Sequence, residues 1–576
     1  MKQLMLGNEA VARGLYEAGC AFVSSYPGTP STEITEAIAK YQEVYAEWAP
    51  NEKVAMEAAF GASLAGRRSF CGMKHVGLNV AADPLFTISY TGVNAGMVIG
   101  VADDAGMHSS QNEQDSRHYA MAAKIPMLEP ADSAEALALT KLAYEISENF
   151  DTPVLVKMCT RVSHSQSLVE LGERVEKIGE YKKDIPKYVM MPGNAKRRHP
   201  VVEARTQALI AYAEEAEINT VEAGSDHSMG ILTSSTSYQY VKEVVGDTYP
   251  VMKLGMIWPM PEKKIRSFAA SVEKLVVVEE LDGFIEAHCK NLGIECTGKE
   301  LFSCIDELSQ NKVAQQLGGK VVNGTKLEET IPPRPPVMCA GCPHRGLFYT
   351  LKKNKVTVLG DIGCYTLGAV APLAAVDSVI CMGASVSGIH GFSKSQQGAA
   401  DGKTVAVIGD STFMHSGITG LVNIAYNESN ATVIIVDNSI TGMTGHQQNP
   451  TTGFNLKGDP CAKIDLESLC RAVGIRRVRV VDPYNLAQCD EAIKEELAAN
   501  EPSVIISRRP CALLKYVKHK APLVVEEEKC IGCKACMKIG CPAISIVNGK
   551  AKVDATQCVG CGVCEQLCKV GALKEV

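Results

Sequence analysis

The cysteines near the end of the chain constrain its fold more than any other feature. Of 22 cysteines in 576 residues, fourteen are scattered and eight fall between Cys530 and Cys568. These eight form two runs with a repeat of 28 residues, Cys530, Cys533, Cys536, Cys541 and Cys558, Cys561, Cys564, Cys568. In a cytosolic chain, dense regular cysteines indicate bound metal rather than disulfides, whereas scattered ones are mostly small core residues.

This spacing resembles that of bacterial two-cluster ferredoxins, in which the fourth cysteine of each run binds the other cluster. The resemblance implies two [4Fe–4S] clusters, held by Cys530, Cys533, Cys536, Cys568 and by Cys558, Cys561, Cys564, Cys541. The sequence departs from that pattern by one extra residue before Cys541 and by Lys569 in place of the second proline. Either change can bend a loop without removing a ligand. Zinc is the alternative occupant.

A second pattern predicts a buried strand, a crossover helix and another buried strand, over Val405–Ile408, Ser416–Ala425 and Thr432–Val436. Gly409 is expected to turn the chain sharply after the first strand, with Asp410 on the turn. Asn438 follows the second strand. Because parallel strands end at one edge of a sheet, Asp410 and Asn438 should meet there as oxygen ligands, which suits Mg²⁺.

Gly-Asp, a helix and then Asn at the next strand end resemble the diphosphate-binding signature of thiamine-diphosphate enzymes. The resemblance implies that Asp410, the Asn438 side chain and the Ile440 carbonyl hold Mg²⁺ against the diphosphate, next to Gly409. The usual third residue of the signature is glycine, and here it is Ser411. The alternative is an ordinary α/β crossover with an aspartate in its turn.

Two loops near the start of the same segment are further candidates. Cys339 and Cys342 form a Cys-x₂-Cys pair, which invites a metal or redox interpretation. We discount it, because no second pair follows at zinc-finger spacing and the loop leads into a diphosphate-binding type of domain. We expect the diphosphate to meet residues of this loop and of the next glycine-containing loop instead: Cys342, His344, Arg345, Gly363 and Cys364.

The remaining chain alternates helical patterns with short apolar strands, which is typical of parallel α/β sheets. A stretch near 184–201, rich in Pro and basic residues, is expected to be a linker, as is Ile331–Pro336. The segment between these linkers resembles the transketolase carboxyl-terminal domain. We therefore expect four domains: a thiamine pyrimidine-binding domain, a transketolase C-terminal-like domain, a diphosphate/Mg-binding domain and a ferredoxin domain, at 1–190, 200–320, 335–520 and 521–576.

Residues 51–66 are rich in alanine and predict a closely packed helix that starts near Glu52. In thiamine enzymes a glutamate at such a helix start reaches the aminopyrimidine ring. Glu57 is the competing residue, but its position within the helix favours a surface or partly buried contact. The alternative for Glu52 itself is an acidic residue favoured by the helix dipole.

Composition adds limits on function. With 46% hydrophobic and 21% charged residues the chain is typical of globular enzymes, and a net charge of −7 gives no case for nucleic acid. The first residues contain no apolar core of signal-peptide length, and no apolar run approaches a membrane span. We expect a cytoplasmic protein.

A thiamine core joined to a dicluster tail resembles the 2-oxoacid:ferredoxin oxidoreductase family, and the domain order is similar to the large (alpha) subunit of members that act on aryl 2-oxoacids of the indolepyruvate type. The resemblance implies oxidative decarboxylation of the oxoacid with coenzyme A, and electron transfer to an external ferredoxin. It also implies that Glu52 activates the cofactor and that Thr29, together with Arg117 of the polar loop 102–117, faces the oxoacid. Related single-chain enzymes carry a further domain of about two hundred residues that is not matched here, so a small beta subunit is implied, in an α₂β₂ assembly.

Two other classes of function stay open. A non-oxidative thiamine decarboxylase or synthase would share the core but would have no use for the cysteine tail. An electron-transfer protein would use the tail but would need neither Glu52 nor the pair Asp410 and Asn438. The sequence also leaves open whether the oxoacid is aromatic, branched-chain, pyruvate or 2-oxoglutarate.

Overall fold

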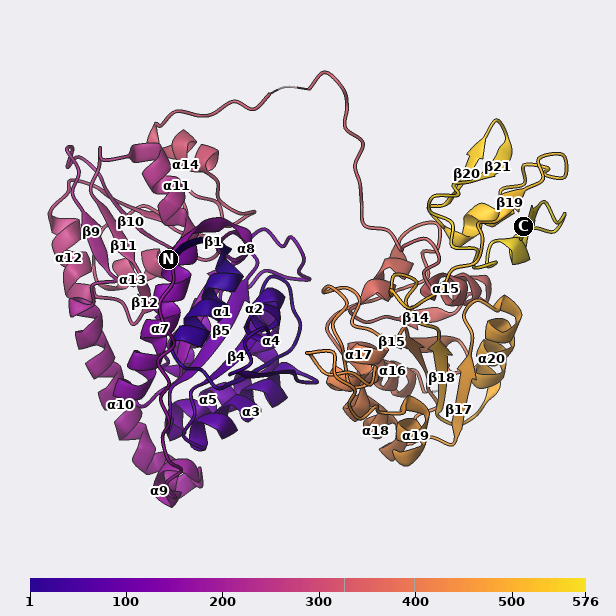
Figure 1. Cartoon of the computed structure of the whole chain (residues 1–576), viewed down its shortest axis with the longest axis horizontal. Coiled ribbons are helices and arrows are strands. Elements are labelled where there is room, and N and C mark those ends of the chain that lie inside the picture. The colour runs from indigo at the N-terminus through magenta and orange to yellow at the C-terminus, as the bar shows by residue number, and fades with distance from the viewer. Residues whose placement is uncertain (326, 398, 576) are drawn as a thin grey trace. The chain divides into compact units, whose positions relative to one another are not determined.

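The computed structural model describes residues 1–325, 327–397 and 399–575. It divides into two compact units, residues 1–327 and 328–576, and each is considered by itself. Both units are built on sheets whose strands run mainly parallel, with helices around them (Figure 1). The predicted α/β class is therefore confirmed.

The larger sheet of the first unit has seven strands in the order β12-β6-β7-β5-β4-β2-β3. Their bounds are β2 Phe22–Ser25, β3 Tyr45–Trp48, β4 Ser69–Lys74, β5 Met97–Asp103, β6 Met127–Leu128, β7 Val154–Cys159 and β12 Met256–Trp258. All neighbours are parallel except β12 and β6. Every residue of β4, β5 and β7 is buried, because helices cover both faces of a parallel sheet.

The helices of this layer are α1 Gly7–Glu17, α2 Thr32–Ile38, α3 Glu52–Leu64, α4 His75–Val80, α5 Ala82–Thr91, α6 Arg117–Ala123, α7 Ser133–Phe150 and α8 Thr160–His164. Helix α1 packs on α7, and α3 packs on α5 and on strands β2 and β4. A short antiparallel pair, β1 Lys2–Leu6 and β8 Gln166–Glu170, lies beside α1. Helix α3 begins at Glu52, as the sequence predicts.

A smaller sheet of the same unit has the order β13-β10-β11-β9. Its elements are β9 Thr220–Glu222, β10 Gly230–Ser234, β11 Val251–Leu254, β13 Leu275–Val278, and the helices α11 Ser235–Val245, α12 Glu262–Ala270, α13 Phe284–Asn291 and α14 Gln310–Leu317. Strand β12 leaves this region and joins the edge of the larger sheet through β6. One hydrophobic core therefore contains side chains of both sheets, such as Ile99 and Leu254.

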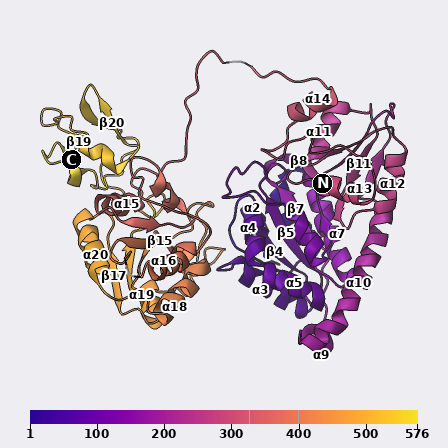
Figure 2. The same ribbon diagram turned by 180° about the vertical axis from the view of Figure 1, so that it is seen from behind.

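The expected linker near 184–201 is wrong. A short helix, α9 Ile185–Tyr188, is followed by the 24-residue helix α10 Pro192–Glu215, which includes the basic run and Pro200 (Figure 2). Two arginines of α10 anchor it: Arg198 Nε donates to Tyr90 O (2.7 Å), and Arg205 donates to Ser89 O (2.7 Å). These long-range bonds, which local composition does not reveal, hold the helix despite its internal proline.

The second unit has a five-stranded parallel sheet in the order β14-β15-β16-β18-β17. Its strands are β14 Thr357–Leu359, β15 Thr404–Gly409, β16 Thr432–Asp437, β17 Arg477–Val481 and β18 Ser503–Arg508. Its helices are α15 His344–Lys353, α16 Ala384–Ser395, α17 Asp410–Thr412, α18 Ile418–Tyr426, α19 Leu466–Ala472 and α20 Leu486–Ala498, with a 3₁₀ turn η1 at Cys364–Ala369 and a π-helical turn η2 at Phe413–Gly417. Strands β15 and β16 with α18 between them confirm the predicted strand–helix–strand.

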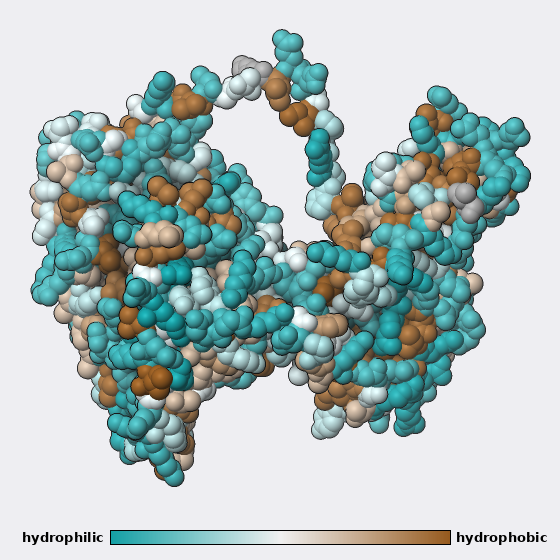
Figure 3. All heavy atoms as spheres, viewed as in Figure 1, coloured by the Kyte–Doolittle hydropathy of each residue, from teal (hydrophilic) through white to brown (hydrophobic). Residues whose placement is uncertain are grey.

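The cysteine-rich tail packs on this unit next to α15. It contains two small antiparallel pairs, β19 Val524–Val525 with β22 Leu573–Lys574 and β20 Ile544–Val547 with β21 Lys550–Val553, and the 3₁₀ turns η3 Ala535–Ile539 and η4 Glu565–Leu567. Figure 3 shows hydrophobic side chains on its surface, where Ile531 and Val570 are exposed. Among the described residues, no helix is both long and apolar enough to cross a membrane.

Candidate functional site

The Asp410 carboxyl, the Asn438 side-chain amide and the Ile440 carbonyl converge where β15 and β16 end. One end of the Asn438 side-chain amide lies 2.7 Å from the Ile440 carbonyl oxygen and 3.1 Å from Asp410 Oδ1. With nitrogen at that end, the amide donates to both oxygens. With oxygen there, three oxygen ligands face one another, which is favourable only around a cation. The donor set predicted from the sequence is therefore brought together, and it fits a hard cation such as Mg²⁺.

The Asp410 carboxyl is buried, and burial together with the nearby Asp437 raises its pKa to about 7. Its second oxygen, Oδ2, accepts hydrogen bonds from Asn449 Nδ2 (3.2 Å) and Thr451 Oγ1 (3.0 Å). These two bonds orient the carboxyl and leave Oδ1 directed toward Asn438. Sequence reasoning missed Asn449 and Thr451, because they lie on a loop outside the strand–helix–strand pattern.

Gly409 has a different role from the expected one. Its φ of −76° is open to any residue, so no sharp glycine turn is needed. A β-carbon there would instead lie 2.6 Å from Tyr365 Cε1, so the glycine permits the aromatic ring to pack against the strand end. Ser411, which replaces the usual glycine, is buried and accepts a hydrogen bond from Thr441 Oγ1 at 2.9 Å. Through this hydrogen bond, Ser411 links the Asp410 turn to the loop after β16.

The loop before α15 is buried beside Tyr365. His344, the first residue of α15, packs edge-on against the Tyr365 ring at 6.0 Å, and burial lowers the pKa of His344 to about 4. His344 is therefore neutral and can serve as a hydrogen-bonding group. Arg345 points elsewhere: its guanidinium donates to the carbonyl oxygens of Cys339 (3.1 Å) and Ile539 (3.2 Å), so it fastens the tail to α15 and does not face the Asp410 turn. The expectation that Arg345 meets a diphosphate is not supported.

Four thiols outside the tail gather close to this loop. Burial raises the pKa of Cys342 to about 12, and the thiols of Cys364 and Cys339 add to the rise. Burial likewise raises the pKa of Cys364 to about 11, with Cys511 and Cys339 as contributing neighbours. The structure thus brings two single cysteines, 22 and 169 residues beyond Cys342, to the Cys-x₂-Cys pair that we had discounted. A search confined to paired cysteines could not find them.

In the first unit, Glu52 lies buried at the start of α3, where Asn51 Oδ1 caps the helix by accepting from Val54 N (2.9 Å). The main chain of α4 passes against its carboxyl: a β-carbon at Gly77 would be 2.5 Å from Glu52 Oε1. Glu57 is half-exposed and pairs with Lys53 at 3.1 Å, as expected for a surface contact. Thr29 is partly exposed in the loop between β2 and α2.

Arg117 is not open to a substrate. Its side chain is 2% exposed, and its guanidinium pairs with Asp115 Oδ2 (2.6 Å) and Glu279 Oε2 (2.6 Å). It also donates to the carbonyl oxygens of Glu280 (2.8 Å) and Asp282 (3.1 Å). Arg117 therefore ties the two sheets of the first unit together, and the expectation that it faces the oxoacid is not supported by this geometry.

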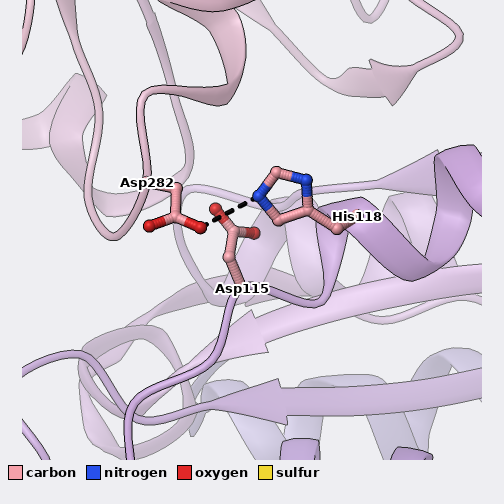
Figure 4. A group of neighbouring side chains, drawn as sticks. All are labelled: Asp115, His118 and Asp282. Atoms are coloured by element: carbon pink, nitrogen blue, oxygen red, sulfur yellow. Dashed lines mark hydrogen bonds and ion pairs between the residues drawn. The ribbon is translucent and has the colours of Figure 1, made fainter.

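Asp115, His118 and Asp282 lie close together beside Arg117 (Figure 4). His118 Nε2 pairs with Asp282 Oδ2 at 2.9 Å. Both oxygens of Asp115 accept from Arg117, and this ion pair holds the pKa of Asp115 down at about 2 despite burial that acts to raise it. The guanidinium already supplies the positive charge here, so the group needs no metal.

The tail cysteines fall into two groups of four. Cys530, Cys533, Cys536 and Cys568 line one cavity, together with Ile531 and Val570. In the other group, Cys541, Cys558 and Cys561 are charged neighbours that act with burial to raise the pKa of Cys564. This is the grouping that crossed ligation requires. Main-chain amides donate to the sulfurs of both groups, Ala551 N to Cys530 (3.4 Å) and Leu523 N to Cys558 (3.5 Å), as suits cluster-binding thiolates.

Three family models match the chain. Residues 13–225 match the thiamine-diphosphate-binding region of pyruvate flavodoxin/ferredoxin oxidoreductases, residues 361–507 the C-terminal binding domain of thiamine pyrophosphate enzymes, and residues 522–569 a 4Fe-4S dicluster domain. The fold and the site together define a thiamine-dependent oxidoreductase that carries a 4Fe-4S dicluster domain.

Curated relatives identify the family more closely than the family models do. Indolepyruvate oxidoreductase subunit IorA of Archaeoglobus fulgidus is 39% identical over 100% of this chain and 97% of its own length, and that of Pyrococcus horikoshii is 40% identical with the same coverage. The 2-oxoglutarate synthase subunit KorA of Archaeoglobus fulgidus is 26% identical over 49% of this chain and 88% of its own length. The chain belongs to the indolepyruvate oxidoreductase subunit IorA family, the large subunits of indolepyruvate:ferredoxin oxidoreductases.

Proposed function

We propose that this chain, with a small beta subunit, oxidatively decarboxylates aryl 2-oxoacids of the indolepyruvate and phenylpyruvate type. The products are the arylacetyl-coenzyme A, CO₂ and two electrons, which pass to an external ferredoxin. The observation that carries the proposal is the presence in one chain of three features: the converging side chains of Asp410 and Asn438 with the Ile440 carbonyl, the buried Glu52, and eight cysteines grouped in two fours. The names of the full-length relatives supply the class of oxoacid.

The residues divide the work as follows. Asp410, Asn438 and the Ile440 carbonyl would hold Mg²⁺ and, through it, the diphosphate, and His344 and Gly363 would contact the diphosphate. Glu52 would hydrogen-bond the aminopyrimidine ring and move a proton at that ring, and Thr29 would face the oxoacid. Thiamine diphosphate, when bound, supplies the carbanion that attacks the oxoacid and the sink for its decarboxylation. The buried position of Glu52 favours this proton transfer, because water does not compete for the carboxyl.

Electrons need a route from the Asp410 turn to the tail. The thiols of Cys339, Cys342, Cys364 and Cys511 are suited to a third iron–sulfur cluster on that route. One side of this group lies near the cofactor loops, since a β-carbon at Gly442 would be 3.4 Å from Cys364 Sγ. The other side meets the tail, since the hydroxyl of Tyr484 donates to Gly341 O and Gln566 Nε2 donates to Tyr484 O at 2.7 Å. These contacts support a position of the four thiols between the proposed diphosphate site and the cysteine-rich tail.

The partners follow from the same proposal. A beta subunit supplies what this chain lacks for full activity, in an α₂β₂ assembly, and its support is that the full-length relatives are described as subunits. Coenzyme A is the acyl acceptor. Branched-chain oxoacids, pyruvate and 2-oxoglutarate are the competing substrates.

The test is an anaerobic viologen-reduction assay of the chain co-purified with its partner, across a panel of 2-oxoacids. We expect coenzyme-A-dependent reduction with arylpyruvates at a higher kcat/KM than with the other oxoacids. A higher kcat/KM with another oxoacid would show that the substrate class proposed here is wrong. Release of CO₂ with no viologen reduction would show a non-oxidative decarboxylase and refute the proposal.

A further inference from the structure

Since Arg117 is fully engaged within the protein, the carboxylate of a substrate must find another cation near Glu52. Lys74 is the last residue of β4, and it lies at the carboxyl edge of the seven-stranded sheet, three residues before Gly77 of α4, which packs against Glu52. The loop that carries Thr29 crosses directly over it: a β-carbon at Gly28 would be 3.2 Å from Lys74 Cβ. Lys74 therefore sits between the two residues that the proposed function places at the reacting end of the substrate.

The charge of Lys74 is not paired directly with a carboxylate of the described residues. The side chain is 7% exposed, and Nζ donates to the Ser109 carbonyl oxygen at 2.7 Å, but no carboxylate of the described residues lies within 4.0 Å of it. Asp104, the acid whose charge acts on it, directs its oxygens to Ser109 N (2.9 Å) and Thr160 Oγ1 (2.8 Å). By contrast, buried Lys157 pairs with Glu129 at 2.8 Å.

Burying an ammonium group that has no direct ion-pair partner costs free energy, and this cost lowers the pKa of the group. Burial lowers the pKa of Lys74 to about 8, and Asp104 offsets only part of that effect. An anion that binds next to Nζ would remove the penalty. The arrangement is therefore suited to a negatively charged ligand.

The neighbouring His75 supplies a second unsatisfied polar atom. Its ring is fully buried, Nε2 lies 3.2 Å from the Asn112 carbonyl oxygen, and Nδ1 has no partner among the described residues. Because Nε2 must donate to that carbonyl, the neutral ring leaves Nδ1 as an acceptor. Burial, and the charge of Lys74, hold the pKa of His75 down against the opposing effect of Asp103. This Nδ1 can accept a hydrogen bond from a ligand donor but cannot bind an anion, so the charge available to an anion comes from Lys74.

We propose that Lys74 binds the carboxylate of the 2-oxoacid. This inference rests on the proposed function, in which the oxoacid reacts beside the ring that Glu52 binds. The carboxylate is the one charged group that the substrate must bring to the reacting end. It leaves as neutral CO₂, so the ion pair is made with the substrate and is lost with the product.

The test compares Lys74→Met and Lys74→Arg in the complex with the partner subunit, with Lys53→Gln as the matched control. Lys53 lies beside Glu52 but is 41% exposed and already pairs with Asp83 at 2.6 Å. We expect Lys74→Met to raise the KM for phenylpyruvate by about 10²-fold, the effect of losing one partner of a buried charge pair. Lys74→Arg should retain most of the affinity, and Lys53→Gln should be unchanged. Thiamine diphosphate binding, measured by calorimetry, should be equal in all variants.

A charge-specific readout separates this role from a structural one. The binding preference for phenylpyruvate over its neutral methyl ester should be strong in the wild type and should vanish in Lys74→Met. The kcat/KM of the wild type should fall as the pH rises through about 8, because the ammonium is present below that value and lost above it, whereas Lys74→Arg should stay level. The groups that face Lys74 and share its titration are Asp104 and His75, with Asp103 behind the latter.

An unchanged preference for the acid over the ester in Lys74→Met would overturn the proposal. A second result would also overturn it: Lys74→Met loses thiamine binding, while the KM of Lys74→Arg is unaltered at every pH. Failure of the proposed function looks different: the wild type itself would then show no coenzyme-A-dependent reduction with any arylpyruvate. In that case the thermal shift of the thiamine-loaded chain by phenylpyruvate still tests Lys74, since a shift that survives Lys74→Met refutes the ion pair.

Discussion

The carboxyl of Glu52 and the main chain at Gly77 are in direct contact, because a β-carbon at Gly77 would lie 2.5 Å from Glu52 Oε1. The first turn of α4 thus fixes the position of the glutamate that begins α3. The α4 backbone at Gly77 restricts the rotamers of the Glu52 side chain, so the carboxyl is oriented before any cofactor binds. Position 77 consequently accepts only glycine if Glu52 is to keep this orientation.

Glu52→Gln should separate binding of the cofactor from its activation. The amide keeps the size of the side chain and can still form a hydrogen bond, but it cannot take up a proton. We expect thiamine diphosphate to bind while kcat falls by about 10²-fold or more, the range for loss of general acid–base catalysis. Glu57→Gln, on the exposed side of the same helix, is the matched control and should retain full activity. Near-normal turnover of Glu52→Gln would move the proton transfer to another residue.

Asp410→Ala should release the metal and the diphosphate together. The substitution removes the carboxylate of the converging group and leaves Asn438 and Ile440 without an anionic partner. After gel filtration we expect loss of Mg²⁺ and thiamine diphosphate, with the iron content equal to that of the wild type, since no cysteine is changed. Asp459→Asn, in an exposed loop, should retain the cofactor. Wild-type affinity in Asp410→Ala would exclude this site.

Local pattern was enough to predict the elements that carry Glu52, Asp410 and Asn438. Each of these residues stands at the end of a helix or strand whose periodicity is strong, and parallel strand ends meet at one edge regardless of details elsewhere. The spacing of the tail cysteines similarly reflects ligand geometry within a short segment. These features needed no knowledge of distant contacts.

Long-range contacts account for the errors. Arg117 looked like a single cation in a polar loop, but Glu279, which follows β13, reaches it and buries it. Pro200 and the basic run looked like a linker because the carbonyls that anchor α10 belong to residues more than a hundred positions earlier. Cys511 could not be joined to Cys342 for the same reason. Nothing in the local sequence marks such partners.

Arg117→Met should destabilise the first unit rather than weaken substrate binding. Removing the guanidinium leaves Asp115 and Glu279 buried without a counterion, and breaking a buried ion pair in this way costs about 3–5 kcal/mol. Thermal or denaturant unfolding of the chain measures the effect. Arg161→Met is the control, because its pair with Glu307 is at the surface and should contribute about 1 kcal/mol or less. A stable Arg117→Met variant with a selectively raised KM would restore the substrate-facing role.

The four thiols near Tyr365 predict iron beyond that of the tail. Anaerobically purified protein should contain about twelve irons per chain rather than eight, if each cluster holds four. Cys364→Ser should lose the excess iron and leave the tail clusters assembled, whereas Cys304→Ser, at an exposed and isolated cysteine, should lose none. Eight irons in the wild type would show that these thiols hold no cluster.

Cys541 provides the strictest test of the tail, because the extra residue before it could present a different ligand. The structure places it with Cys558, Cys561 and Cys564, and a separate cavity is lined by Cys530, Cys533, Cys536 and Cys568. Loss of Cys541 should therefore damage the cluster built on the later run, although Cys541 belongs to the earlier run in sequence. Cys533→Ala should have the reciprocal effect and damage the other cluster.

The measurement combines iron analysis with electron paramagnetic resonance of the reduced protein. Two reduced clusters in one small domain couple magnetically, so the wild type should show a coupled spectrum. Cys541→Ala and Cys533→Ala should each show the signal of a single remaining cluster, and the two signals should differ. The same preparations are assayed with and without the beta subunit, and the wild-type chain alone should turn over poorly. Intact, coupled clusters in Cys541→Ala would remove Cys541 from the ligand set, and full coenzyme-A-dependent activity of the lone chain would remove the need for a partner.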